Sequence, residues 1–103
     1  MNIMLACALG MSTSLLVTKM LAAAKAQGKD YHIWAVDIES VEYEEGYDVV
    51  LLGPQVSNRI AEVRDSVDND RIPVAVIDRS DYGKCNGAAV LAFAEQLCQK
   101  NEK

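Results

Sequence analysis

The sequence is short of positive charge. It has 10 Lys and Arg residues against 15 Asp and Glu residues, a net charge of -5, and no basic residue before Lys19. Proteins that bind DNA or RNA generally need a basic surface to neutralise the phosphates. This balance therefore argues against nucleic acid as a partner.

Long apolar runs and a paired set of cysteines are also missing. No stretch approaches the length of a membrane helix, about 20 apolar residues, so we expect no direct membrane insertion, and any role in transport would need a separate membrane partner. Cys7, Cys85 and Cys98 are odd in number, which does not suit a disulfide framework and favours a reducing cytoplasm. With a single histidine, they also lack the spacing of a zinc site.

A chain of 103 residues is long enough for one domain but not for two, so we expect residues 1–103 to form a single domain. Its apolar segments alternate between strand and helix patterns. We expect strands at 1–6, 31–36, 48–52 and 73–77. We expect helices at 15–27, 54–67 and 88–100, with a short helix near Val41 and Gly28 ending the first long helix.

This alternation favours an α/β fold: an open four-stranded parallel sheet with helices on both faces, joined by right-handed crossovers. In such a sheet the loops that follow the carboxyl ends of the strands form the binding crevice. Three notable loops fall there, at Cys7–Ser14, Gly53–Gln55 and Asp78–Gly87. We therefore expect these loops to form one site.

The first of these loops has the composition of an anion-binding loop. It holds one thiol, one glycine and three hydroxyls, and no charged side chain. A helix that follows it, capped by Thr13 or Ser14, would point its positive end at the same place. The residues whose backbone N–H groups, and in part hydroxyls, could surround a phosphate are Ala8, Leu9, Gly10, Met11, Ser12, Thr13 and Ser14.

Cys7 is the candidate nucleophile of this loop. A thiol near a helix N-terminus and backbone donors favours the thiolate, which can attack without a histidine base. Phosphoryl transfer depends mainly on donors placed around the three equatorial oxygens. Free cysteines are often buried core residues, but the place of Cys7 at a strand end before a Gly/Ser/Thr loop favours a functional role.

One residue separates this loop from that of a cysteine phosphatase. Such a phosphatase uses Cys-x5-Arg-Ser/Thr, in which the arginine binds the phosphate through two hydrogen bonds. Counted from Cys7, the arginine position is Thr13 and the hydroxyl position is Ser14. Without the arginine the loop could accept and pass on a phosphoryl group but would hydrolyse it poorly. A small cysteine phosphatase or arsenate reductase, or a regulatory binding module, remains an alternative.

The other two loops offer residues on the partner or substrate side of the site. Pro54 and Gln55 either stop a strand and open a helix or contact a ligand or partner. Asp78 and Asp81 are turn residues, or one of them is a general acid. Tyr82 is either a lid over the loop or a surface contact. These alternatives stay open on the sequence alone.

Three further reactive side chains carry less weight. His32 lies in a strand among apolar residues, where a structural or surface role is favoured over a role as phosphoryl carrier. Cys98 falls on the apolar face of the last helix, which favours core packing. Cys85 lies at the edge of the site, where a surface position is favoured over a second nucleophile.

Together these segments resemble the enzyme IIB component of sugar phosphotransferase systems, of the lactose/cellobiose/chitobiose class. The residues that carry the resemblance are Cys7-Ala8-Leu9-Gly10-Met11-Ser12-Thr13-Ser14-Leu15-Leu16, Leu51-Leu52-Gly53-Pro54-Gln55, Asp78, Tyr82-Gly83-Lys84 and Gly87. They are spread over nearly the whole length. The resemblance implies a flavodoxin-like topology, similar to the low-molecular-weight tyrosine phosphatase fold, and a transiently phosphorylated cysteine, which would be Cys7.

The resemblance also implies partners. The phosphoryl donor would be a phosphohistidine on a IIA component, and the acceptor a sugar bound to a membrane IIC component during uptake. The protein would thus be a protein-phosphohistidine–sugar phosphotransferase that needs no cofactor and no metal. It would act in the cytoplasm and reach the membrane only through IIC. A β-linked disaccharide such as cellobiose, chitobiose or lactose is the expected sugar class, and no residue chooses among them.

Overall fold

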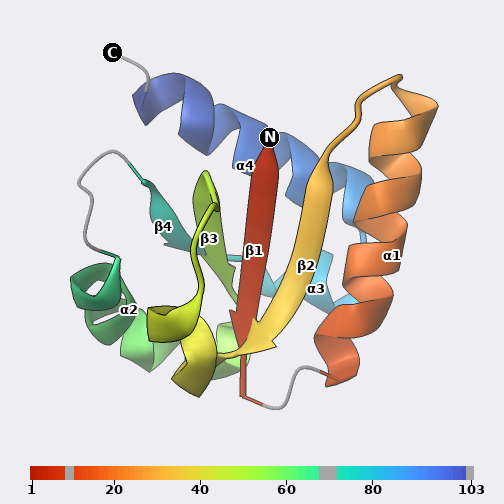
Figure 1. The fold of residues 1–103 in the computed structure, drawn as a ribbon. Helices are drawn as coiled ribbons and strands as arrows, with labels where there is room; N and C mark the ends of the chain where they lie inside the picture. Colours follow the sequence, from red (N-terminus) through yellow and green to blue (C-terminus); the bar gives the residue numbers. More distant parts are fainter. Residues whose placement is uncertain (9–10, 68–71, 102–103) are drawn as a thin grey trace.

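The computed structural model describes residues 1–8, 11–67 and 72–101. Within them lies one parallel sheet with the strand order β2-β1-β3-β4 (Figure 1). The strands are β1 (Asn2–Cys7), β2 (His32–Asp37), β3 (Val49–Leu52) and β4 (Val74–Val76). The predicted four-stranded parallel sheet is thereby confirmed.

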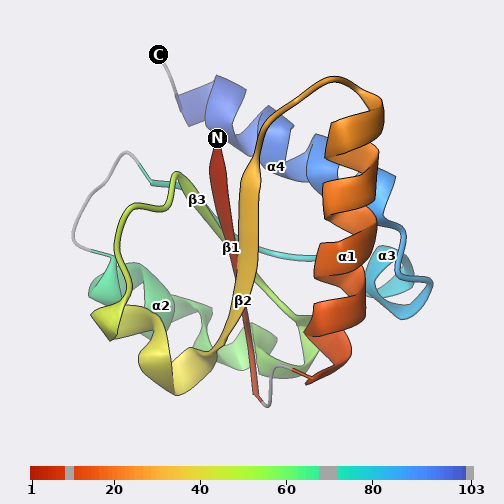
Figure 2. The same ribbon diagram turned by 45° about the vertical axis from the view of Figure 1, so that its right-hand side comes forward.

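Helices cover both faces of the sheet, as predicted (Figures 1 and 2). One face carries α1 (Met11–Ala26), α3 (Arg79–Gly83) and α4 (Gly87–Asn101). The other carries the 3-10 helices η1 (Ile38–Tyr43) and η2 (Pro54–Arg59) and the helix α2 (Ile60–Ser66). The short helix expected near Val41 is η1.

The central strands are buried on both faces, as long apolar runs in a parallel sheet require. In β1, Ile3 and Leu5 belong to the core beneath α1 and α4, whereas Met4 and Ala6 belong to the core beneath α2. All four side chains are fully buried. The strand that leads into Cys7 is therefore held on both sides.

The carboxyl ends of the strands meet at one edge of the sheet. Ala6 pairs with Leu52 in the β1–β3 ladder, and Leu52 pairs with Val76 in the β3–β4 ladder. One residue further, the Gly53 N–H donates to the Ala6 carbonyl at 2.9 Å, and the Ile77 N–H donates to the Leu52 carbonyl at 2.8 Å. The loops after β1, β3 and β4 thus begin side by side, as the topology predicted.

The first helix begins earlier than expected. Because α1 begins at Met11, Thr13 and Ser14 lie inside its first turn, and the prediction that one of them caps it is wrong. Hydroxyl residues are favoured both at the cap and in turns near it, so a row of three does not identify the cap. Leu9 and Gly10 lie outside the described residues. At its other end α1 stops at Ala26, and Gly28, the predicted end signal, follows it with a φ of 72°.

Two other segments differ from the expected elements. The predicted loop from Asp78 to Gly87 contains the helix α3, whose five residues are too short to show a helical period. The single helix expected after Gly53 is divided into η2 and α2, with a non-helical conformation at Val56. Its apolar face is nevertheless buried through Val56 and Val63.

Gly87 sets the spacing between the two long helices. A Cβ at this position would lie 2.4 Å from the backbone carbonyl carbon of Lys19 and 2.6 Å from the Met20 nitrogen. Real Cβ atoms do not approach backbone this closely, so only glycine lets α4 begin directly against α1. The close contact keeps α1, and with it the first turn that follows the Cys7 loop, against the body of the protein.

Candidate functional site

Cys7 is the last residue of the central strand β1 and stands opposite Asp37 in the β1–β2 register. It is buried, with 3% of its surface exposed, whereas Ala8 after it is exposed. The position of the thiol is therefore set by a central strand that is buried from Ile3 to Cys7, at the point where the chain turns outward.

The first turn of α1 follows Cys7 closely. Three residues separate Cys7 from Met11, so the helix begins beside the end of β1 (Figure 1). The first four N–H groups of a helix have no partner within the helix, and they carry the positive end of its dipole. The first turn of α1 contains no Asp or Glu that would occupy this end. Four of the predicted phosphate-binding residues, 11–14, thus lie in a turn suited to an anion.

Thr13 and Tyr82 connect this turn to helix α3. Thr13 is fully buried, and its hydroxyl oxygen lies 3.3 Å from the Tyr82 hydroxyl, with either group able to donate. Tyr82 is half-buried and packs against the core beneath α1 and α4. The Thr13 hydroxyl is therefore engaged by Tyr82, and the backbone N–H is the group that Thr13 can offer to an anion. Tyr82 makes an internal contact and is not a plain surface residue.

Gly53 brings the three loops into contact. A Cβ placed on Gly53 would lie 3.5 Å from the Cys7 Cβ, 3.5 Å from Cε1 of Tyr82 and 2.9 Å from Oε1 of Gln55. Cys7 ends β1, Gln55 follows β3 and Tyr82 follows β4, so the segments that the sequence assigned to one site do meet. Sequence reasoning treated Gly53 as a strand breaker and missed it as a contact residue. A glycine directly after a buried strand that ends at the same edge was the available signal.

Pro54, Gln55, Asp78 and Tyr82 follow β3 and β4 at this edge of the sheet, and we call them the rim. Pro54 is the first residue of η2 and half-buried, and Gln55 beside it is exposed. Both therefore begin a helix, as one of the two interpretations held. Asp78 caps α3, because its carboxylate accepts the Asp81 N–H at 3.1 Å. This supports the turn role of Asp78.

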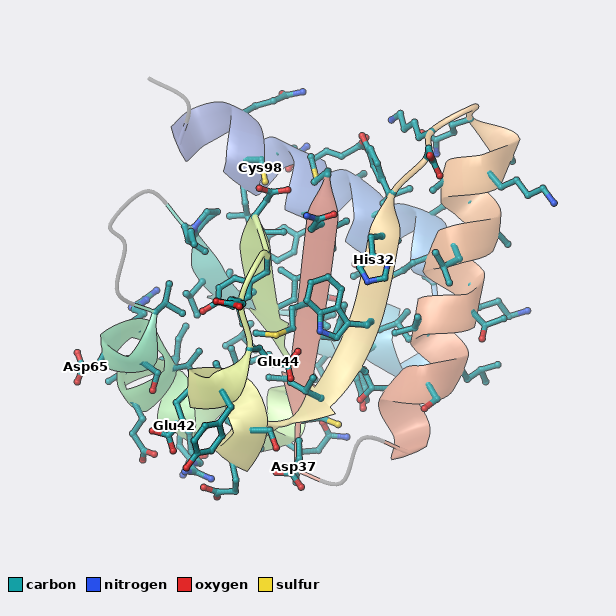
Figure 3. The ribbon with its side chains drawn as sticks, in the orientation of Figure 1. His32, Asp37, Glu42, Glu44, Asp65 and Cys98 are labelled. Atoms are coloured by element: carbon teal, nitrogen blue, oxygen red, sulfur yellow. The ribbon has the colours of Figure 1, made fainter. Side chains whose placement is uncertain are left out.

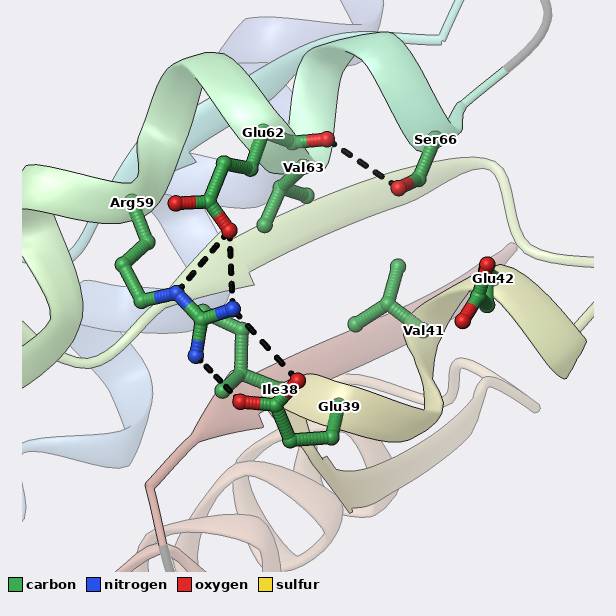
Figure 4. Close-up of a pocket in the computed structure, with 8 residues that line it drawn as sticks. All are labelled: Ile38, Glu39, Val41, Glu42, Arg59, Glu62, Val63 and Ser66. Carbon is green, nitrogen blue, oxygen red and sulfur yellow. Dashed lines mark hydrogen bonds and ion pairs between the residues drawn. The ribbon is translucent and has the colours of Figure 1, made fainter.

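Arg59 follows Gln55 by four positions, but its guanidinium is bound by two glutamates and not directed to the Cys7 loop. The Arg59 guanidinium lies 2.5 Å from Oε2 of Glu39, and it donates to Oε2 of Glu62 at 2.8 and 3.1 Å (Figure 4). The hydrogen bond from Arg59 lowers the pKa of Glu39, and the two carboxylates raise the pKa of Arg59. Residues 7–14 themselves contain no Lys or Arg.

The other reactive side chains lie away from this edge. Asp37 marks the carboxyl end of β2, whereas His32 lies at the opposite end of that strand and Cys98 lies on α4 (Figure 3). His32 is exposed and its ring is 4.7 Å from the ring of Trp34, which confirms a surface position. Cys98 packs against the core as predicted. Cys85 is half-buried in the turn after α3, with a φ of 51°.

Among residues 1–8, 11–67 and 72–101, no group of three or more His, Cys, Asp or Glu side chains is arranged to hold a metal ion. The helices in the same residues include none that is long and apolar enough to cross a membrane.

Comparison with known proteins places this geometry in a family. Residues 2–93 match the family model described as "PTS system, Lactose/Cellobiose specific IIB subunit". The chain is 48% identical over 101 residues to the galactose-specific EIIB component of Lactococcus lactis subsp. cremoris and to the cellobiose-specific EIIB component of Lactococcus lactis subsp. lactis, with 92% of this chain and 94% of each relative covered. It is 44% identical to the oligo-beta-mannoside-specific EIIB component of Bacillus subtilis, over 84% of both chains.

Solved structures agree in fold. The cellobiose-specific IIB component of Borrelia burgdorferi matches with a TM-score of 0.79 and 34% identity, over 98% of this chain and 94% of that one. The lactose-specific IIB component domain of Streptococcus pneumoniae matches with a TM-score of 0.82 over 94% and 96%, and at 16% identity it supports the fold alone. The chain therefore belongs to the lactose/cellobiose-specific IIB subunit family of the sugar phosphotransferase system, as its motifs indicated.

Proposed function

We propose that the protein is the phosphoryl carrier of a sugar phosphotransferase system and that Cys7 holds the phosphoryl group. One observation carries the proposal: only three residues separate the thiol that ends the buried central strand from a helix turn free of acidic residues. Membership of the IIB family supports the same role. On this proposal residues 1–103 act as one domain in the cytoplasm.

In the first step the Cys7 sulfur attacks the phosphorus of a phosphohistidine on the IIA component. The S–P bond forms in line with the P–N bond, which breaks and releases the histidine. In the second step a hydroxyl oxygen of the sugar bound to IIC attacks the same phosphorus. The O–P bond forms, the S–P bond breaks, Cys7 returns as the thiolate, and the hydroxyl proton passes to a base on the acceptor side.

The chain's own contribution is a set of positioned donors. The backbone N–H groups of residues 8–14 surround the three equatorial oxygens, and the hydroxyls of Ser12 and Ser14 add to them. A phosphorylated side chain carries about two negative charges, and no cation in the loop balances them. The group is therefore held by dipoles, which suits a carrier that must release it to the next acceptor.

The rim serves the partners. Pro54, Gln55, Asp78 and Tyr82 follow β3 and β4 at the edge where β1 also ends, and they would contact the IIA component in the first step and the IIC component in the second. Sugar selectivity belongs to the membrane component. A β-linked disaccharide is the expected class; the relatives' names support it in the cellobiose-specific and oligo-beta-mannoside-specific components, and a third relative is named galactose-specific.

The test is intact mass after incubation with phosphoenolpyruvate, the general phosphotransferase proteins and a IIA component. We expect the wild type, Cys85→Ser and Cys98→Ser each to gain one phosphoryl group and Cys7→Ser to gain none. A gain on Cys7→Ser, or no gain on the wild type with a donor that phosphorylates a relative, would contradict the proposal. Turnover of an aryl phosphate would instead favour a phosphatase, and partner binding without transfer would favour a regulatory module.

A further inference from the structure

A groove of about 570 Å³ lies outside the site, between the end of β4 and helix α4. Its floor is apolar and includes Ile77, Ala89 and Phe93, and Ala92 stands exposed on its α4 side. Among the described strands β4 is an edge strand of the sheet (Figure 1). The small side chains on α4 leave room above the floor, so the groove can accept apolar side chains of another chain.

One end of the groove is acidic. Asp78 and Asp81 line it where β4 ends, and neither takes part in an ion pair among the described residues. The cleft between η1 and α2 is different, since its Glu39 and Glu62 carboxylates are both bound by Arg59 (Figure 4). Of these two hollows, the groove beside β4 is the one that combines an apolar floor with carboxylates left for a cationic partner.

The groove is near the thiol without covering it. Strand β4 is two strands away from β1 in the sheet, a distance of about 10 Å. Helix α3 begins directly after Asp78 and carries Tyr82, which lies close to Gly53 at the edge beside Cys7. A segment seated in the groove would therefore hold its own protein close to Cys7 while leaving the approach to the sulfur open to a small acceptor.

We propose that this groove docks a cytoplasmic segment of the membrane IIC component, with apolar side chains on the floor and a Lys or Arg against Asp78 and Asp81. This inference rests on the proposed carrier function. Cytoplasmic loops of membrane proteins carry an excess of Lys and Arg, which complements the acidic end of the groove and the net charge of -5.

The two steps of transfer can be measured apart. Loading is followed as the rate at which the chain takes its phosphoryl group from a IIA component. Delivery is followed as transfer from the preloaded chain to cellobiose in inside-out vesicles that carry a cellobiose-class IIC component. A chain that fails to load contradicts the carrier function itself.

Ala92→Glu places a large charged side chain over the groove at an exposed helical position, and Ala22→Glu makes the same change on the exposed surface of α1. We expect Ala92→Glu to raise the KM for the preloaded chain in delivery on the order of tenfold, with kcat and loading unchanged. Ala22→Glu should change neither step. An unchanged KM for Ala92→Glu, or slower loading with normal delivery, would overturn the proposal.

A charge variant tests the acidic end separately. Asp81→Asn removes one carboxylate without changing the size of the side chain, and Asp65→Asn does so on the exposed surface of α2 (Figure 3). We expect Asp81→Asn to raise the delivery KM several-fold at low salt and to match the wild type at high salt, because screening removes the attraction. Equal KM values for the two variants at low salt would count against a cationic occupant.

Discussion

The two faces of the sheet are built in different ways. On one face the two long helices α1 and α4 are in direct contact at Gly87. On the same face Thr13 of α1 contacts Tyr82 of α3, and Glu95 of α4 binds both Lys29 and Tyr31 just before β2. The other face carries only the short helices η1, η2 and α2, with a non-helical residue at Val56. Their polar link is Arg59 with its two glutamates, whose side chains are 71% and 64% exposed.

This difference assigns the positioning of Cys7 to the face with the long helices. The face with the long helices holds both the first turn of α1 and Tyr82, the elements that surround Cys7. The other face is joined mainly by apolar packing of Val41, Val56 and Val63 and by ion pairs in water, which contribute little to stability. Substitutions in the polar contacts of the first face should therefore change stability and the site together, whereas loss of the exposed ion pairs on the second face should change little.

The largest effect is expected at Gly87. In Gly87→Ala the added Cβ would clash with the backbone of α1, and we expect the free energy of unfolding to fall by about 2–3 kcal/mol. Gly83→Ala is the matched control, since a Cβ there meets nothing within 4 Å. Urea denaturation followed by circular dichroism measures both. Equal stability of the two variants would contradict the close contact of α1 and α4.

The second-largest loss of stability is expected at Glu95, because it accepts hydrogen bonds from two residues and its side chain is only 19% exposed. We expect Glu95→Gln to lower the free energy of unfolding by about 1–2 kcal/mol. The hydrogen bond to Glu95 also raises the pKa of Tyr31 from 10.0 to about 12. The stabilisation from the Tyr31–Glu95 hydrogen bond is therefore complete below pH 10 and is lost as the pH rises through about 12.

An NMR titration of the tyrosine rings checks this directly. In the wild type Tyr31 should titrate near pH 12, and in Glu95→Gln its pKa should fall back towards 10. A Tyr31 pKa that does not respond to Glu95→Gln would show that the contact does not form in solution.

A smaller effect on stability but a clear effect on transfer is expected at Thr13 and Tyr82. Loss of the hydroxyl contact in Thr13→Val or Tyr82→Phe should cost about 1 kcal/mol and slow phosphoryl loading, because the first turn of α1 is less firmly held. Thr13→Ser keeps the hydroxyl and should load normally. A double-mutant cycle on unfolding measures the coupling, and strictly additive effects would mean that the two hydroxyls do not interact.

The smallest effect is expected on the opposite face. Arg59 lowers the pKa of Glu39, so the stabilisation from this pair is present above the usual titration range of glutamate and is lost as the pH falls through the lowered value. Glu39→Gln should lower the melting temperature slightly at low salt and neutral pH, and not at high salt or acidic pH. Glu42→Gln, on the same 3-10 helix, is the control. A large loss for Glu39→Gln would contradict the contrast between the faces.

Much of the fold follows from local patterns. The apolar runs at Ile3–Ala6 and Val49–Leu52 predict buried parallel strands because their side chains need cover on both faces. Parallel topology then brings Cys7, Gly53 and Asp78 to one edge without further information. The place of the candidate site was therefore predictable from the sequence.

The finer arrangement depends on contacts between distant residues. Thr13 and Tyr82 are 69 positions apart, and their contact exists only because α3, too short for a periodic pattern, follows β4 directly. The start of α1 at Met11 could not be read from three successive hydroxyl residues, each of them a good cap. Gly53 has an ordinary extended conformation, with a φ of -63°, so no turn signal marks it. Its closeness to Cys7 and Tyr82 depends on all three loops being in place.

The central claim is that Cys7 carries a phosphoryl group held by backbone N–H groups in a loop without cations. The amide spectrum of ¹⁵N-labelled protein, recorded before and after phosphorylation through a IIA component, tests it most directly. The account predicts the largest shifts, to lower field, at the amides of residues 8–14, with little change at Arg59, and no shifts for Cys7→Ser. Small shifts in this loop, with the largest changes elsewhere in a protein that has gained a phosphoryl group, would contradict the account.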